Sequence, residues 1–84
     1  MDIKKISEAI GVKLMPCESS NIKAYGWFDN SLWVLFKRGL LYKYINRPEK
    51  DFWDLYEAKS IGKWVYNNLV KNKAPFISYT IKET

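Results

Sequence analysis

The segment from Ser31 to Tyr44, which reads SLWVLFKRGLLYKY, constrains the fold more than any other part of this chain. Two apolar runs flank the short polar segment Lys37-Arg38-Gly39, and this pattern is typical of a β-hairpin. A three-residue loop with Gly39 in the left-handed conformation places Val34 opposite Tyr42 and keeps the lysines off the apolar face. The sequence therefore predicts two antiparallel strands in a defined register.

Both faces of this predicted hairpin are apolar. The face expected to form the core carries Leu32, Val34, Phe36, Leu40, Tyr42 and Tyr44. The opposite face carries Trp33, Leu35, Leu41 and Ile45, with Lys43 among them. A face this apolar is either an interaction surface or is covered by another element. Two alternatives stay open: a protein interface, most simply a homodimer or higher oligomer, and coverage by an N-terminal helix.

A short amphipathic helix is predicted within residues 1–14. Ile3, Ile6 and Ile10 recur at helical spacing on one face, and Gly11 is a natural helix end. This segment is the candidate cover for the second face of the hairpin.

The remaining elements complete an α+β domain. A strand over residues 22–27 precedes the hairpin, which gives a three-stranded antiparallel meander. Two C-terminal helices are expected, one opened by Pro48 with a buried stripe of Phe52, Leu55 and Tyr56, and one from Ile61, capped by Ser60, to about Lys71. The chain is thus divided into a helical segment (1–14), a central domain (15–75) and a tail or short edge strand (76–84).

The composition argues against several classes of chemistry. The 84 residues contain one cysteine, Cys17, and no histidine, so the sequence lacks the usual general base at neutral pH and a zinc ligand set. We expect a binding protein rather than an enzyme, with no catalytic residues, metal or cofactor. The single cysteine fits a reducing, cytoplasmic setting, and the sequence lacks an apolar run of the ~20 residues that a membrane span requires.

The order of motifs from about residue 15 to residue 75 resembles the KTSC domain, which is named from the C-terminus of some lysyl-tRNA synthetases and also occurs alone in small bacterial and phage proteins. The matching residues are Ser19-Ser20-Asn21-Ile22, Gly26, Asp29, Leu32, Val34, Phe36, Gly39, Tyr42, Tyr44, Pro48, Phe52, Leu55, Ala58, Ser60, Gly62, Trp64 and Val65. The resemblance implies a compact α+β module, for which RNA binding has been suggested. Trp33, Leu35 and Leu41 stand at positions that are often polar in the family.

A basic, aromatic group of residues is the leading candidate for a binding site. The net charge of +5 is compatible with a polyanionic partner. We expect cations to neutralise phosphates and aromatic rings to stack on bases, and the predicted RNA-binding residues are Lys37, Arg38, Lys43, Arg47, Tyr25 and Trp27. The other interpretation of the same residues is a solvated turn whose aromatics face the core.

The sequence therefore leaves two functions open. The first is RNA binding through the basic hairpin. The second is protein binding through Trp33, Leu35, Leu41 and Ile45, for example by a phage-encoded inhibitor of a host or defence factor.

Overall fold

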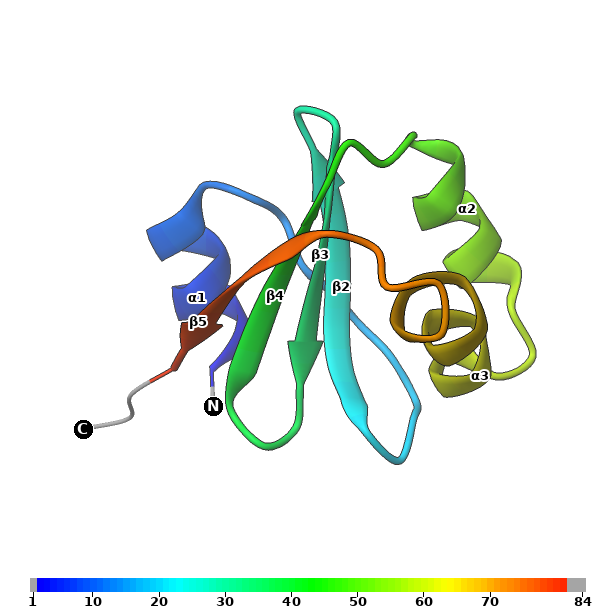
Figure 1. The fold of residues 1–84 in the computed structure, drawn as a ribbon. Helices are drawn as coiled ribbons and strands as arrows, with labels where there is room; N and C mark the ends of the chain where they lie inside the picture. The colour runs from blue at the N-terminus through cyan, green and yellow to red at the C-terminus, as the bar shows by residue number, and fades with distance from the viewer. Residues whose placement is uncertain (1, 82–84) are drawn as a thin grey trace.

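The computed structural model describes residues 2–81 and confirms an α+β fold. Its centre is a five-stranded antiparallel sheet in the order β1-β2-β3-β4-β5. In Figure 1, α1 lies on one side of this sheet and α2 and α3 lie on the other. The elements are α1 (Ile3–Ile10), β1 (Met15–Pro16), β2 (Ile22–Phe28), β3 (Ser31–Phe36), β4 (Leu40–Ile45), α2 (Lys50–Glu57), α3 (Ile61–Val65), the π-helical turn η1 (Tyr66–Val70) and β5 (Phe76–Thr80).

The predicted hairpin register is confirmed. Val34 pairs with Tyr42 and Leu32 pairs with Tyr44. Gly39 has φ = 90°, and its N–H donates to the carbonyl of Phe36 at 3.1 Å. The turn therefore needs the one residue type that adopts this conformation without steric cost.

The sheet has two strands more than the three predicted. Met15–Pro16 pairs with Tyr25 and Ala24 of β2, although a two-residue strand that contains proline lacks a hydrophobic pattern. At the other edge, Phe76–Thr80 pairs with β4 over five successive positions. The short last strand, which the sequence predicted as one of two possibilities for the tail, is therefore formed. Residues 82–84 of the predicted tail lie outside the described residues, as does residue 1.

The N-terminal helix forms as predicted and covers the second face of the hairpin. The Asp2 carboxylate accepts hydrogen bonds from the backbone N–H groups of Lys4 and Lys5, and Gly11 ends the helix at φ = 71°. Such a cap supplies partners for the free N–H groups of the first turn. The isoleucine face packs on a cluster that contains Trp33, Leu35 and Leu41.

Two hydrophobic clusters lie on opposite faces of the sheet. The first contains Leu32, Val34 and Tyr44 and is covered by residues of α2, α3 and η1, among them Leu55 and Leu69. The second contains Ile6, Val12, Leu14, Ala24, Trp33, Leu35 and Leu41. Strand β3 contributes to both clusters, and its first five residues are all buried. Burial on both faces explains why β3 is a continuous apolar run rather than an alternating one.

Two details of the helices differ from the prediction. In α2, Leu55 is fully buried but Tyr56 is 61% exposed, so the buried stripe is narrower than Phe52, Leu55 and Tyr56. The second helix begins at Ile61, and the Ser60 hydroxyl caps it by accepting from the N–H of Lys63 at 3.3 Å. After Val65 it widens into the π-helical η1, where Lys71 donates its N–H to the Tyr66 carbonyl at 2.8 Å. The helical segment ends at Val70, in agreement with the predicted end at about Lys71.

None of the helices within residues 2–81 has the length and apolar character that crossing a bilayer requires.

Candidate nucleic-acid interface

A groove lined by aromatic and basic side chains runs beside the β3–β4 turn. Its main cavity, of about 620 Å³, lies between the end of η1 and the side of β4 and β5 that carries Tyr42 and Phe76. A second cavity, of about 380 Å³, lies between the turn and the loop that carries Ser20 and Asn21. Phe36 and Arg38 line both cavities. We call this surface the Arg38 groove, and its described lining includes Ser20, Asn21, Phe36, Lys37, Arg38, Tyr42, Tyr44, Leu69, Val70, Lys73, Ala74, Pro75 and Phe76.

Strand pairing positions the aromatic rings of this groove. Phe36, Tyr42 and Phe76 project from three neighbouring strands onto the same face of the sheet. The Tyr42 and Phe76 rings stack with centroids 4.4 Å apart, and Phe36 meets Tyr42 edge-on at 5.0 Å. Phe76 forms the outer ring of this group and is 47% exposed. Tyr42 covers one face of the Phe76 ring, and about half of the residue remains accessible to a ligand.

Two cations border the aromatic group. Arg38 is exposed at the hairpin turn, and its guanidinium carbon lies 5.7 Å from the centre of the Phe36 ring. Lys73 is exposed after η1, and its positive φ of 53° turns the chain so that Ala74 enters the core. The described lining of the groove carries three cationic side chains and lacks a carboxylate.

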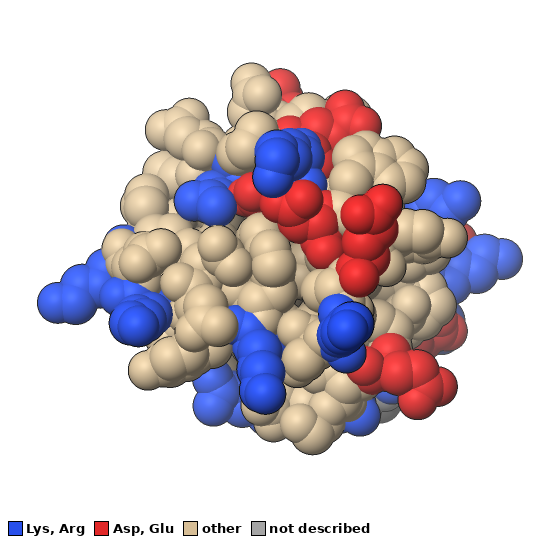
Figure 2. Space-filling view, turned by 90° about the vertical axis from the view of Figure 1, so that its right-hand side faces the viewer, with Lys and Arg blue, Asp and Glu red and all other residues tan. Residues whose placement is uncertain are grey.

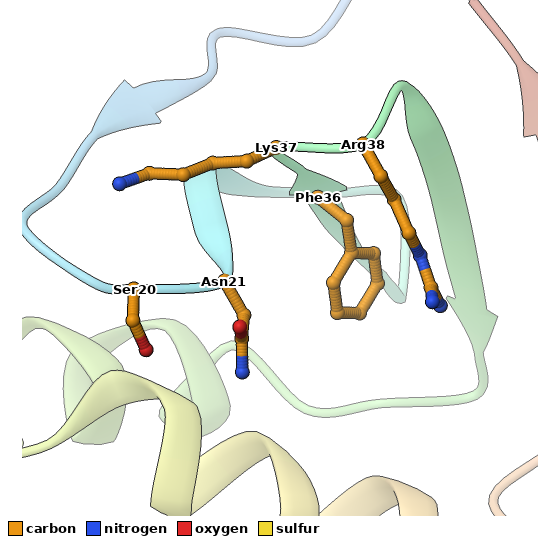
Figure 3. A pocket seen from close by; sticks show the side chains of 5 residues that line it. All are labelled: Ser20, Asn21, Phe36, Lys37 and Arg38. Carbon is orange, nitrogen blue, oxygen red and sulfur yellow. The ribbon is translucent and has the colours of Figure 1, made fainter.

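Figure 3 shows the smaller cavity at close range. The side chains of Asn21, Phe36 and Arg38 point the same way, with the phenyl ring between the amide and the guanidinium. Lys37 extends in another direction, so Arg38 is the cation of the turn that faces the ring.

Tyr44 also lines the main cavity, but it is almost wholly buried. Burial, with a smaller effect from Tyr42, raises the pKa of Tyr44 to about 12. The phenol therefore stays protonated at neutral pH and retains a hydrogen-bond donor.

The structure separates the six predicted RNA-binding residues. Only Lys37 and Arg38 lie in the groove. Lys43 lies on the α1 face, where its ammonium group is 5.4 Å from the Trp33 ring centre. Alternation along β4 places that face opposite Tyr42.

The other three residues lie beside α2 or in the core. Arg47 forms an ion pair with Asp51, and its carbonyl accepts a hydrogen bond from the Trp27 indole at 2.9 Å. These contacts join the end of β2 to the beginning of α2. The predicted exposure of Tyr25 is wrong: it is only 3% exposed, because its ring packs against Phe52 at 5.3 Å.

The structure also shows where the four residues predicted to form a protein interface lie. Trp33, Leu35 and Leu41 are buried in the cluster beneath α1, and Ile45 is half-buried. Of the two alternatives for this face, coverage by the N-terminal helix is the one observed. The face is therefore not a free surface while α1 is docked.

The polar loop before β2 has a structural role. The Ser19 hydroxyl accepts hydrogen bonds from the N–H groups of Asn21 and Ile22, each at 3.3 Å. Burial raises the pKa of the Cys17 thiol, which disfavours the reactive thiolate at neutral pH.

Charge is distributed unevenly over the surface. Figure 2 shows the side that carries α2 and α3, where acidic side chains gather in one region while lysines and arginines are dispersed. Two of the α2 carboxylates are already paired, Asp51 with Arg47 and Asp54 with Lys50. The α2 region is therefore a less favourable surface for a polyanion than the Arg38 groove.

Sequence reasoning missed Phe76 as a member of this site and included Lys73 only on the condition that the second helix lies near the hairpin. Phe76 reaches the groove because it pairs with Tyr44, and Lys73 because the chain turns just before β5. The alternation of residues 76–81 indicated a strand but not its neighbour. The β4–β5 register was the missing signal.

Comparison with known proteins agrees with this architecture. The model of the KTSC domain matches residues 18–73, which is more than half of the chain. A crystal structure of a KTSC domain protein from Yersinia pestis is similar, with a TM-score of 0.66 and 27% sequence identity over 84% of this chain and 99% of that one. None of the curated proteins compared matches the chain. The extent of the family match, together with the shared fold, places this chain in the KTSC domain family.

Proposed function

We propose that this protein is a non-enzymatic module that binds single-stranded RNA along the Arg38 groove. The observation that carries the proposal is the half-exposed Phe76 ring in a groove that Arg38 and Lys73 also line and whose described lining lacks carboxylates. A base stacked on the exposed part of the Phe76 ring would contribute about 1–3 kcal/mol. Arg38 and Lys73 would then contact the phosphates on either side of that base.

Recognition of this kind is expected to be tolerant of sequence. Stacking uses the flat face that every base has, and ion pairing uses the phosphate backbone. The exposed Asn21 amide is positioned to contact base edges or the ribose hydroxyl. Any preference among bases should therefore be modest.

Protein binding stays a prediction, including the inhibition of a host or defence factor by a phage-encoded protein. Since α1 covers the sheet face that the sequence indicated for it, this alternative would require another surface.

The proposal is tested by fluorescence anisotropy of a labelled single-stranded oligouridylate over a range of salt concentrations. The double variant Arg38→Glu/Lys73→Glu is expected to weaken binding by tenfold or more. The slope of log K against log salt is negative, and its magnitude should decrease by about 0.7 for each phosphate that the protein no longer neutralises. The matched control, Lys4→Glu/Lys5→Glu, changes the net charge equally at two exposed residues of α1. It should retain most of the affinity.

Phe76→Leu separates stacking from charge, because it removes the ring but keeps an apolar side chain. A loss of about tenfold with an unchanged salt slope is expected for one stacked base. The proposal fails if the parent protein does not bind the oligonucleotide at low salt, or if the α1 control weakens binding as much as the groove variant.

A further inference from the structure

The two edges of the sheet are unequal. Edge strand β1 has only two residues and ends with Pro16, which lacks a backbone N–H. Edge strand β5 has five residues, FISYT, without charge or proline, and every one of them is exposed. Natural proteins commonly protect a sheet edge by shortness, proline or charge, and β5 uses none of these.

The hydrogen bonds to β4 establish which backbone groups of β5 point outward. Ile81 donates its N–H to the Gly39 carbonyl at 2.8 Å, and the Pro75 carbonyl accepts from Ile45 at 3.2 Å. Antiparallel pairing alternates along the strand, so residues 75, 77, 79 and 81 direct their backbone groups to β4. Phe76, Ser78 and Thr80 therefore direct their N–H and C=O groups to the open edge.

We propose that β5 pairs with β5 of a second copy of this chain, antiparallel and centred on Ser78. A twofold axis at this residue pairs Phe76 with the partner's Thr80 and Ser78 with the partner's Ser78. Each of these is a hydrogen-bonded pair, so all the outward N–H and C=O groups of the three residues find partners. Pairing centred on another residue would leave part of the edge unmatched.

The side chains are self-complementary in the same register. On the groove face Phe76 lies opposite Thr80, and on the α1 face Ile77 lies opposite Tyr79. Aromatic residues opposite β-branched residues are favourable cross-strand pairs. Because residues 76–80 are uncharged, two identical strands meet without like-charge repulsion. Phe76, Ile77 and Tyr79, exposed by 47%, 46% and 42% respectively, all lose exposed area on pairing.

One strand pair is a small contact compared with the ~1,200 Å² or more of stable interfaces. We therefore expect a reversible dimer with a micromolar rather than nanomolar dissociation constant. This inference does not depend on RNA binding, and it is tested on the protein without RNA.

Sedimentation velocity between about 10 µM and about 1 mM protein is expected to show a concentration-dependent dimer. Ser78→Pro removes an outward N–H that makes no bond to β4, so the fold is expected to tolerate it. The dissociation constant should rise at least tenfold, because two central hydrogen bonds are removed per dimer. Ser78→Ala keeps the N–H and should dimerise like the parent. If Ser78→Pro does not fold, Thr80→Pro makes the same change near the strand end.

Amide hydrogen exchange identifies the surface involved. With rising concentration the amides of Phe76, Ser78 and Thr80 should become protected, while those of Ile77 and Tyr79 are protected throughout by β4. A parent that stays monomeric over the whole range, a dimer that survives the proline substitutions, or protection that does not alternate along β5 would each overturn the proposal.

Discussion

Replacing Ile6 with aspartate is expected to detach α1 from the sheet and to lower the free energy of unfolding by about 3–4 kcal/mol. Ile6 is 8% exposed and packs in the cluster with Trp33, Leu35 and Leu41. A carboxylate in that apolar position would bear a large desolvation cost, so the helix is expected to leave the sheet rather than bury it. Domains of this size have a net stability of only about 5–10 kcal/mol, so the effect is large.

The matched control is Ala9→Asp, which introduces the same side chain at an exposed position of the same helix. It should cost less than about 1 kcal/mol, mainly through lower helix propensity. Chemical denaturation followed by circular dichroism measures both variants. Equal losses for the two variants would mean that α1 does not hold the cluster together.

Detachment of α1 should also uncover an apolar surface around Trp33. Binding of a hydrophobic dye and concentration-dependent light scattering are therefore expected for Ile6→Asp but not for Ala9→Asp. This outcome would show that the sheet face around Trp33 can act as an interaction surface once α1 is detached. An interaction surface is one of the two alternatives that the sequence leaves open for this face.

Replacing Gly26 with alanine is expected to destabilise the protein by about 1–3 kcal/mol. Gly26 lies in β2 beneath the segment that joins α1 to β1. A methyl group there would lie 2.5 Å from the Lys13 carbonyl oxygen and 3.2 Å from side-chain atoms of Val12 and Leu14. The backbone at Lys13 must therefore shift, and both flanking apolar side chains with it.

Gly62→Ala is the control, and for this variant we expect an increase in stability. Its methyl group would meet only the Ser19 hydroxyl at an ordinary 3.7 Å, and α3 should gain up to about 1 kcal/mol from the better helix former. Urea denaturation of the two alanine variants should therefore move the midpoint in opposite directions. A Gly26→Ala protein as stable as the parent would contradict the close approach of residues 12–14 to β2.

The parts of the fold that could be predicted from the sequence are those with a local physical cause. The turn at Gly39 determines the hairpin register, the isoleucine spacing and Gly11 define α1, and Ser60 caps α3. Strand β1 was missed because its two residues are held by β2 and carry no pattern of their own.

The candidate site was harder to predict because burial of single aromatic residues is decided by tertiary packing. Tyr25 is 3% exposed because Phe52 of α2 packs against its ring, a contact that no local pattern in the sequence indicates. Arg38, Phe76 and Lys73 line one cavity only because β4 pairs with β5. The basic turn is predictable from its residues and does border a groove, whereas its aromatic partners depend on long-range register.

The double burial of β3 has a consequence for the unfolded chain. The hexapeptide Ser31–Phe36 lacks charge, proline and glycine, and segments of this type readily form intermolecular β-structure once released from a fold. Asp29 on one side and Lys37-Arg38 on the other are the flanking charges that oppose such association. We therefore expect the refolding yield after heat denaturation to fall as protein concentration rises, and a yield independent of concentration would show that these flanking charges are sufficient gatekeepers.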